Sequence, residues 1–261
     1  MRSLGSTQPP IPQFFLLNPI PRFFHVYIDA FAGAGQHISK ATQELVSGSP
    51  LNALSVRPQF REFHLIDIAP EKIENLRELI GHRKDVFLYQ GDCNEILRRD
   101  VFPRVQYNQY RRGLCVLDPY GLHLDWNVIS TAGHMETLDL FLNFPVQDMN
   151  RNVFWRNPDG VSKAQILRMN LFWGDESWRD VVYETKWNLF NIPEKEPNEV
   201  VAEAFRRRLK EVGGFARVPE PLPMKNSTGA IIYYLYFASQ NKTAEKIARE
   251  IFAKYHEHGG E

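Results

Sequence analysis

The sequence predicts an α/β domain built on a doubly wound, mostly parallel sheet. Five short apolar runs alternate with helical patterns along the first half of the chain. Each run is apolar at consecutive positions, as in strands that are buried on both faces of a parallel sheet. Strands that alternate with helices are typical of βαβ units. The five runs are residues 25–31, 62–68, 86–92, 114–120 and 138–144.

Length and composition fit one globular unit. The chain has 261 residues, of which 43% are hydrophobic and 24% are charged, so we expect a sizeable core. Lys plus Arg and Asp plus Glu both total 31, so a global basic field that would attract nucleic acid is excluded and only a local patch remains open.

The two cysteines and the amino-terminal segment indicate the cellular compartment of the protein. Cys93 and Cys115 lie in or beside expected core strands without zinc-ligand spacing, which indicates a reducing compartment and predicts no metal site. Residues 1–24 are Pro-rich, and prolines interrupt the apolar stretch "FFLLNPIPRFF". We therefore expect neither a signal peptide nor a membrane span, and the sequence predicts a cytoplasmic protein.

The helices between the strands carry recognisable terminal residues. Pro70 suits the first turn of a helix that Gly81 ends. Ser49 is expected to cap a helix that Pro50 opens, and Asp125 to cap another helix after the fourth strand.

The pattern changes after the fifth strand. Residues 147–195 read as an aromatic-rich insertion, and a long helix is expected over 197–214. Two runs, 214–218 and 230–239, follow without a helix between them, which predicts an antiparallel pair at the sheet edge before a last helix over 243–255. The insertion holds four of the five tryptophans, namely Trp155, Trp173, Trp178 and Trp187.

The turn after the first strand carries the first candidate site. In "YIDAFAGAG" the spacing D-x-F-x-G-x-G places Asp29, Phe31, Gly33 and Gly35 at the carboxyl end of a strand. Glycines there let a ligand approach bare backbone. The dinucleotide fingerprint is incomplete because Ile38 occupies its third small position, and no phosphate-loop Gly-Lys-Ser/Thr follows. A cofactor turn and a purely structural turn remain the alternatives.

Three more carboxylates follow the next three strands. Asp67 ends the second strand, Asp92 follows the third and Asp118 the fourth, so together with Asp29 they converge on one crevice. A carboxylate in the position of Asp67 can accept hydrogen bonds from two ribose hydroxyls. The alternative for Asp67 is the N-cap of the helix that Pro70 opens.

The ordered segments of this chain resemble a known family. "YIDAFAGAG" is similar to the first motif of class I S-adenosylmethionine-dependent methyltransferases. Together with "GSPLNAL", "GDCNEIL", "LDPYGLHLDW", "NFPVQDMNRN" and "LYFAS" it resembles the three-Cys-motif partner protein (TcmP) family from about Tyr27 to Tyr255. The resemblance implies a class I methyltransferase-like (Rossmann-like) domain over residues 25–261, with a mostly parallel seven-stranded sheet and the aromatic-rich insertion.

The resemblance also implies a cofactor, S-adenosyl-L-methionine. The glycine turn would pass under its methionine part, and the acidic residues after the second and third strands would meet the ribose and the adenine. The implied cofactor-binding residues are Asp29, Phe31, Gly33, Gly35, Asp67, Asp92 and Cys93.

The segment after the fourth strand suggests the chemistry. Asp118, Pro119 and Tyr120 resemble the D/N-P-P-Y/F motif of amino-group methyltransferases, without its second proline. An exocyclic amine on a nucleobase is a poor nucleophile because its lone pair is delocalised into the ring. A carboxylate and a backbone carbonyl would accept its two N–H groups, and an aromatic ring would stack on the base. The alternative is a strand-ending Asp-Pro turn.

The sequence therefore supports two candidate functions. The first is S-adenosylmethionine-dependent methylation of an amino group on a nucleic acid base, with nucleic acid as the partner. The second is a non-catalytic partner of a three-Cys-motif protein. The missing proline and residues 36–48, which separate the glycine turn from the next helix, favour the second.

The insertion has two interpretations as well. Its tryptophans, beside Arg151, Arg156, Arg168 and Arg179, form either a cationic surface for base stacking or a small core of the insertion itself.

Overall fold

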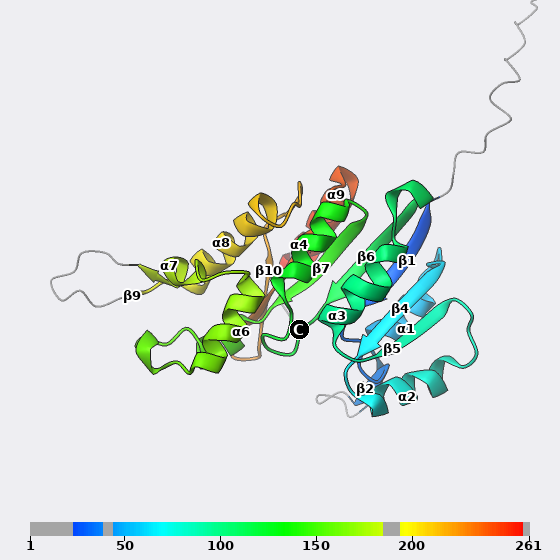
Figure 1. The fold of residues 1–261 in the computed structure, drawn as a ribbon, viewed down its shortest axis with the longest axis horizontal. Helices are drawn as coiled ribbons and strands as arrows, with labels where there is room; N and C mark the ends of the chain where they lie inside the picture. The colour runs from blue at the N-terminus through cyan, green and yellow to red at the C-terminus, as the bar shows by residue number, and fades with distance from the viewer. Residues whose placement is uncertain (1–22, 39–43, 185–193, 258–261) are drawn as a thin grey trace, which may run out of the picture.

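A single seven-stranded sheet forms the centre of the protein in a computed structural model that describes residues 23–38, 44–184 and 194–257 (Figure 1). The strand order is β10-β11-β7-β6-β1-β4-β5. Strands β5, β4, β1, β6 and β7 run parallel, whereas β11 is antiparallel to both β7 and β10. The bounds are β1 Phe24–Asp29, β4 Glu62–Asp67, β5 Val86–Gln90, β6 Arg111–Leu117, β7 Leu138–Phe144, β10 Leu222–Lys225 and β11 Ile231–Ala238. The predicted α/β fold with a mostly parallel seven-stranded sheet is confirmed.

The predicted antiparallel edge pair is confirmed, but its first strand was placed wrongly. Residues 214–218 make only an isolated bridge, between Arg217 and Ser239. The edge strand is β10 instead, in which Pro223 faces Tyr234 across the ladder. Proline cannot donate a ladder hydrogen bond, and an edge strand tolerates it because one side of that strand has no neighbour to bond.

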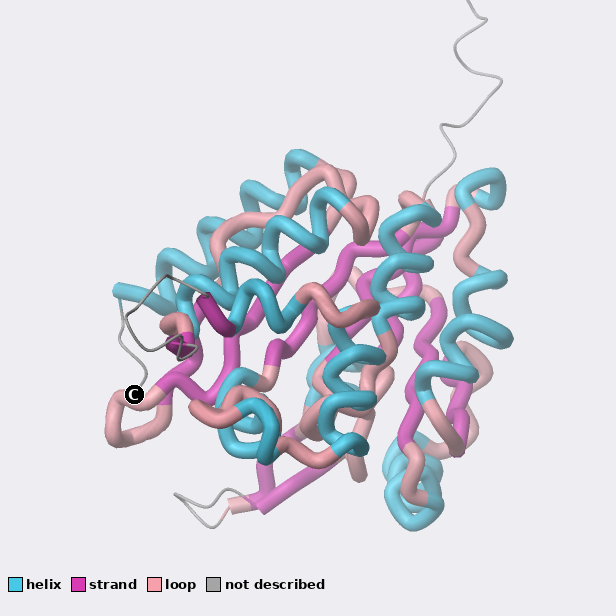
Figure 2. Tube along the Cα trace, turned by 60° about the vertical axis from the view of Figure 1, so that its left-hand side comes forward, coloured by secondary structure: helices cyan, strands magenta, loops and turns pink. Residues whose placement is uncertain are grey.

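Helices cover both faces of the sheet (Figures 1 and 2). The first face, which carries Tyr27 and Phe63, is covered by α1 and α2, and further along the sheet α9 packs over Phe237. The second face carries the largest core, to which α3, α4, α6, α7 and α8 contribute. The helix bounds are α1 Ser49–Ser55, α2 Pro70–Ile80, α3 Cys93–Ile96, α4 Trp126–Met135, α5 Val146–Asn152, α6 Lys163–Trp173, α7 Trp178–Val182, α8 Asn198–Glu211 and α9 Lys242–Glu257.

The insertion packs directly onto this second face. The Phe172 ring of α6 lies 5.8 Å from the Phe144 ring of β7, and the Trp173 ring of α6 lies 5.4 Å from the Phe205 ring of α8, measured between centroids. Trp126 of α4 meets the same Phe205 ring edge-on at 5.9 Å. The insertion therefore shares one core with the sheet. In the part of the chain described, no helix is both long and apolar enough to cross a membrane.

Candidate active site

Four carboxylates gather at one edge of the sheet because parallel neighbouring strands end there. Asp29 and Asp67 are the last residues of β1 and β4. Asp118 directly follows β6, and Asp92 lies two residues beyond β5. The four carboxylates therefore lie at the edge of the sheet where ligands of open α/β sheets bind, outside the carboxyl ends of the strands.

Asp29 organises the turn after β1. One carboxylate oxygen accepts the Phe31 backbone N–H at 3.2 Å, and the other accepts the Tyr27 hydroxyl at 3.1 Å and the Ser49 hydroxyl at 2.6 Å. Burial raises the pKa of Asp29, while these hydrogen bonds oppose the rise by stabilising the anion. The expectation that Ser49 caps its own helix is wrong, because the N-cap is Gly48 and the Ser49 hydroxyl is held by Asp29.

Asp67 fixes the glycine turn and the start of α2 together. Its Oδ2 atom accepts the Gly33 backbone N–H at 2.9 Å and lies 3.4 Å from the Lys72 ammonium. Its Oδ1 atom accepts the Ala69 N–H at 3.0 Å. Asp67 is not the N-cap of α2, because that position is Ala69. The Asp67 carboxylate is buried, and its bond to Gly33 fixes the position of a turn that lies 34 residues earlier in the sequence.

The two glycines of the turn have different surroundings. Both have a positive φ, +65° at Gly33 and +81° at Gly35, which L side chains rarely adopt. A Cβ built on Gly33 would meet no atom within 4 Å. A Cβ on Gly35 would lie 2.8 Å from Leu76 Cδ2 and 3.3 Å from Leu79 Cδ1 of α2. Gly33 therefore leaves open space beside the turn, whereas Gly35 lets α2 approach it.

The long segment between Gly35 and α1 is looped out of the site. Its described parts form an antiparallel ladder of β2 (Gln36–Ile38) with β3 (Leu45–Ser47). The Gly48 N–H donates to the Gly35 carbonyl at 2.7 Å and closes the base of the loop. Helix α1 consequently begins beside the glycine turn, despite the 13 residues of 36–48 that separate them in the sequence.

Asp92 begins helix α3 and stays exposed. Its Oδ1 atom accepts the Asn94 backbone N–H at 2.8 Å, which makes it the N-cap. Cys93 follows with a buried thiol whose pKa is raised to about 12, chiefly by burial. A neutral thiol does not offer a charge to a ligand at neutral pH, so any contact from Cys93 would come from its backbone.

Asn94 is the residue that sequence reasoning missed. Its buried amide donates to Asp92 at 3.0 Å and to the His123 carbonyl at 3.3 Å, and its oxygen accepts the Asp125 N–H at 2.8 Å. It therefore joins the loop after β5 to the loop after β6. The amide two residues after Asp92, inside the helix start "CNEIL", was the available signal.

Asp118 is held from the neighbouring strand. The Asn143 amide nitrogen of β7 donates to Asp118 Oδ1 at 2.5 Å. A carboxylate can only accept, so the nitrogen of the amide faces it. Pro119 is buried, and the Tyr120 ring is 88% exposed. The candidate catalytic set thus consists of a positioned carboxylate, a fixed proline and a free aromatic ring.

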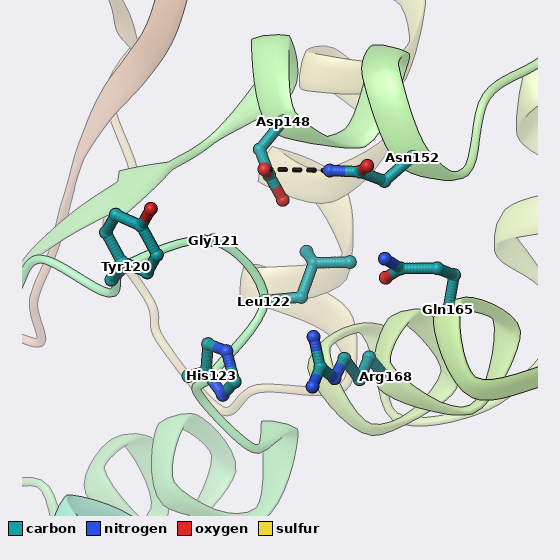
Figure 3. Close-up of a pocket in the computed structure, with 8 residues that line it drawn as sticks. All are labelled: Tyr120, Gly121, Leu122, His123, Asp148, Asn152, Gln165 and Arg168. Carbon is teal, nitrogen blue, oxygen red and sulfur yellow. Dashed lines mark hydrogen bonds between the residues drawn. The ribbon is translucent and has the colours of Figure 1, made fainter.

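A small cavity lies beyond Tyr120 (Figure 3). It has a volume of about 80 Å³ and lies between the loop after β6 and helices α5 and α6. Asp148 and Arg168 face it from opposite sides. Its lining residues are Tyr120, Gly121, Leu122, His123, Asp148, Asn152, Gln165 and Arg168.

The tryptophans of the insertion do not form the expected stacking surface. Trp173 and Trp178 are buried in the main core, and only Trp155 is exposed among those described. Trp187 lies outside the described residues. Arg179 stacks on the Trp178 ring, 4.7 Å from its centroid, instead of flanking a ligand surface. The alternative of a separate core is wrong too, because these rings join the core of the sheet.

No protein-family model matches the sequence, and no curated protein gives a significant match. Among solved structures, a Legionella pneumophila protein of family DUF519 aligns over 88% of this chain and 84% of its own, with 14% identity and a TM-score of 0.49. The CurJ carbon methyltransferase aligns over 87% and 51%, with 14% identity and a TM-score of 0.40. The methyltransferase domain of the bacterial protein CtHen1 aligns over 83% and 90%, with 13% identity and a TM-score of 0.40.

Proposed function

We propose that this protein is an S-adenosylmethionine-dependent methyltransferase that acts on an amino group of a nucleic acid base. The observation that carries the proposal is the glycine turn. The Gly33 backbone is fixed by a buried carboxylate at 2.9 Å, yet the space where its side chain would be is open. A fixed turn with open space beside it is what a cofactor needs in order to lie against bare backbone.

The residues present fit this cofactor. Gly33 and Asp67 would hold its methionine and ribose parts, with Asp67 able to accept more bonds because each oxygen has two lone pairs. Asp92 leaves its carboxylate exposed at the position proposed for the adenine amine. When bound, S-adenosylmethionine supplies a methyl group activated by a sulfonium.

The chain's own contribution to the reaction is positioning. Asp118 would accept one N–H of the acceptor amine, and the Pro119 carbonyl would accept the other. Asn143 keeps the Asp118 carboxylate in place from β7. The exposed Tyr120 ring would stack on the base that carries the amine. Such alignment of two reactants is worth up to about 7–11 kcal/mol of the barrier.

Calorimetric titration tests the proposal. We expect the wild-type protein to bind S-adenosylmethionine and S-adenosylhomocysteine. Asp118→Ala should bind both within about twofold of the wild type while methyl transfer to oligonucleotides is lost. A protein that binds neither compound is not a methyltransferase, and an Asp118→Ala variant that keeps turnover removes Asp118 from the acceptor site.

We also propose that the chain is a three-Cys-motif partner protein, and a second candidate function follows from it. A groove of about 670 Å³ between α7 and α8 is lined mostly by acidic and apolar side chains, among them Asp180, Glu199, Glu203, Val181 and Val200, together with Arg207. This lining favours docking of a protein segment with basic and apolar side chains. Binding of a three-Cys-motif protein by a chain that fails to bind S-adenosylhomocysteine would favour a non-catalytic partner.

A further inference from the structure

We propose that the cavity beyond Tyr120 recognises a cytosine base in single-stranded nucleic acid, next to the base that is methylated. The inference rests on the proposed function for the neighbouring acceptor position. The cavity shares Tyr120 with the candidate catalytic set, but Asp118 does not line it. The base held here is therefore distinct from the one whose amine Asp118 would position.

The size of the cavity selects a single ring. A cavity needs a volume of about 10–15 Å³ to hold one buried water, so this cavity of about 80 Å³ accommodates roughly five to eight water-sized groups. That is the size of one six-membered heterocycle with its substituents, and a purine would not fit fully. The buried Leu122 side chain provides an apolar floor for the ring, and Tyr120 an exposed aromatic neighbour.

The polar side chains divide the cavity into an acceptor side and a donor side (Figure 3). On the acceptor side, Asp148 Oδ1 already accepts the Asn152 amide at 2.9 Å. Asp148 Oδ2 lies 3.1 Å from where a Cβ on Gly121 would be, so it is the oxygen nearest the loop. On the donor side, the side chains of Arg168 and Gln165 make no hydrogen bond or ion pair within the described residues, and Gln165 bonds Ser162 only through its backbone N–H.

Cytosine matches both sides. Its exocyclic amine would donate to Asp148, as acidic side chains do when they recognise cytosine, and its ring nitrogen and carbonyl would accept from Arg168 and Gln165. Thymine or uracil would instead direct a carbonyl at the Asp148 carboxylate, where two acceptors repel each other. A free phosphate is disfavoured for the same reason, since its charge would face Asp148.

Arg168, which lines the cavity, is one of a few described arginines with no partner among the described residues. Within the described residues, four arginine side chains take part in no hydrogen bond, ion pair or ring contact. Three of them, Arg151, Arg156 and Arg168, come from α5, α6 and the segment between these helices. The fourth, Arg207, lies on α8 in the groove beside α7. Unpaired arginines are available for phosphate contacts, which position a strand without reading its sequence.

Fluorescence anisotropy with labelled dC10 and dT10 at low salt tests the pocket. We expect the wild-type protein to prefer dC10 by about fivefold or more, the lower end of what one good base contact contributes. Arg168→Gln should weaken dC10 binding about tenfold. Arg207→Gln is the matched control, because it removes an equally unpaired arginine elsewhere, and it should change binding less than twofold.

Asp148→Asn makes the test independent of folding. The variant keeps an oxygen for Asn152 and replaces the acceptor at the pocket with an N–H donor. We expect its preference to shift from dC10 toward dT10, because a donor now faces the thymine carbonyl. A partly unfolded protein would lose both ligands instead of exchanging one for the other.

Three results would overturn the inference: no binding of either oligonucleotide, equal binding of both by the wild type, or equal weakening by Arg168→Gln and Arg207→Gln. Titration of S-adenosylhomocysteine into the same samples separates this inference from the proposed function. Cofactor binding without base preference leaves the methyltransferase proposal standing and removes the pocket. Base preference without cofactor binding does the reverse.

Discussion

Substituting the two glycines of the cofactor turn should produce opposite defects. Gly33→Ala adds a methyl group where no protein atom lies within 4 Å, so the cost to stability is conformational and about 1–2 kcal/mol for a left-handed residue. Gly35→Ala incurs the same cost and also places its Cβ 2.8 Å from Leu76. Overpacking of a core adds about 1–3 kcal/mol, so the total loss for Gly35→Ala is about 2–5 kcal/mol.

Thermal melts and calorimetry together distinguish the two variants. At about 2–4 °C per kcal/mol for a chain of this size, Gly33→Ala should lower Tm by a few degrees and Gly35→Ala by several degrees more. For S-adenosylhomocysteine binding the order reverses. The methyl group of Gly33→Ala occupies space proposed for the cofactor, and one misplaced methyl group in a pocket changes affinity about tenfold or more.

Gly81 supplies the matched control. It ends α2 with a φ of +66°, and a Cβ there would also meet no atom within 4 Å. Gly81→Ala should lower Tm at least as much as Gly33→Ala, because its ψ of −155° lies in a region that essentially only glycine adopts, while S-adenosylhomocysteine affinity stays unchanged. If Gly33→Ala binds the cofactor as tightly as Gly81→Ala does, the open space beside the turn is not the cofactor site.

Three further outcomes are expected. Asn94→Ala should lower the free energy of unfolding by about 1–3 kcal/mol in urea melts, because it leaves the partly buried Asp125 N–H without its acceptor; an unchanged midpoint would show that Asn94 does not hold the two loops together. The pKa of Asp29 is raised, so its folded state binds a proton more tightly than its unfolded state and the wild type loses stability as pH rises from about 4 through the raised pKa. The Tm of Asp29→Asn minus the Tm of the wild type should therefore be larger at pH 7 than at pH 4. A difference that stays constant with pH would refute the burial argument. Asn143→Ala should bind S-adenosylhomocysteine normally but lower methyl transfer to an oligonucleotide about tenfold, and an unchanged rate would show that the 2.5 Å bond to Asp118 does not position it.

Local sequence patterns were sufficient for the five parallel strands and for the placement of their carboxylates. Consecutive apolar residues predicted the buried strands, and parallel strands necessarily bring their carboxyl ends to one edge. Asp29, Asp67, Asp92 and Asp118 were therefore expected together, and they do lie after four neighbouring strands. Their binding roles remain predictions.

The supporting contacts could not be predicted because they join residues far apart in the sequence. Ser49 is a good N-cap by type, yet its hydroxyl lies 2.6 Å from a buried carboxylate that attracts it more strongly. The sequence does not distinguish the role of Gly35 from that of Gly33, because only the packing of α2 beside Gly35 separates them. The hydrogen bond from Gly48 to Gly35 that closes the base of the loop of residues 36–48 is not predicted by any local sequence pattern.

In the insertion, packing assigns the tryptophans a role that differs from the one their composition suggested. A cluster of tryptophans near arginines suggested a surface for bases, but burial of Trp173 and Trp178 in the sheet's core assigns the rings to stability. That burial fixes α6 against the sheet and so holds Gln165 and Arg168 at the cavity beyond Tyr120. Polar side chains on an anchored helix can discriminate between ligands more sharply than side chains on a loose one, because less freedom is lost on binding. The aromatic residues would then contribute to recognition indirectly, by keeping the polar residues in place.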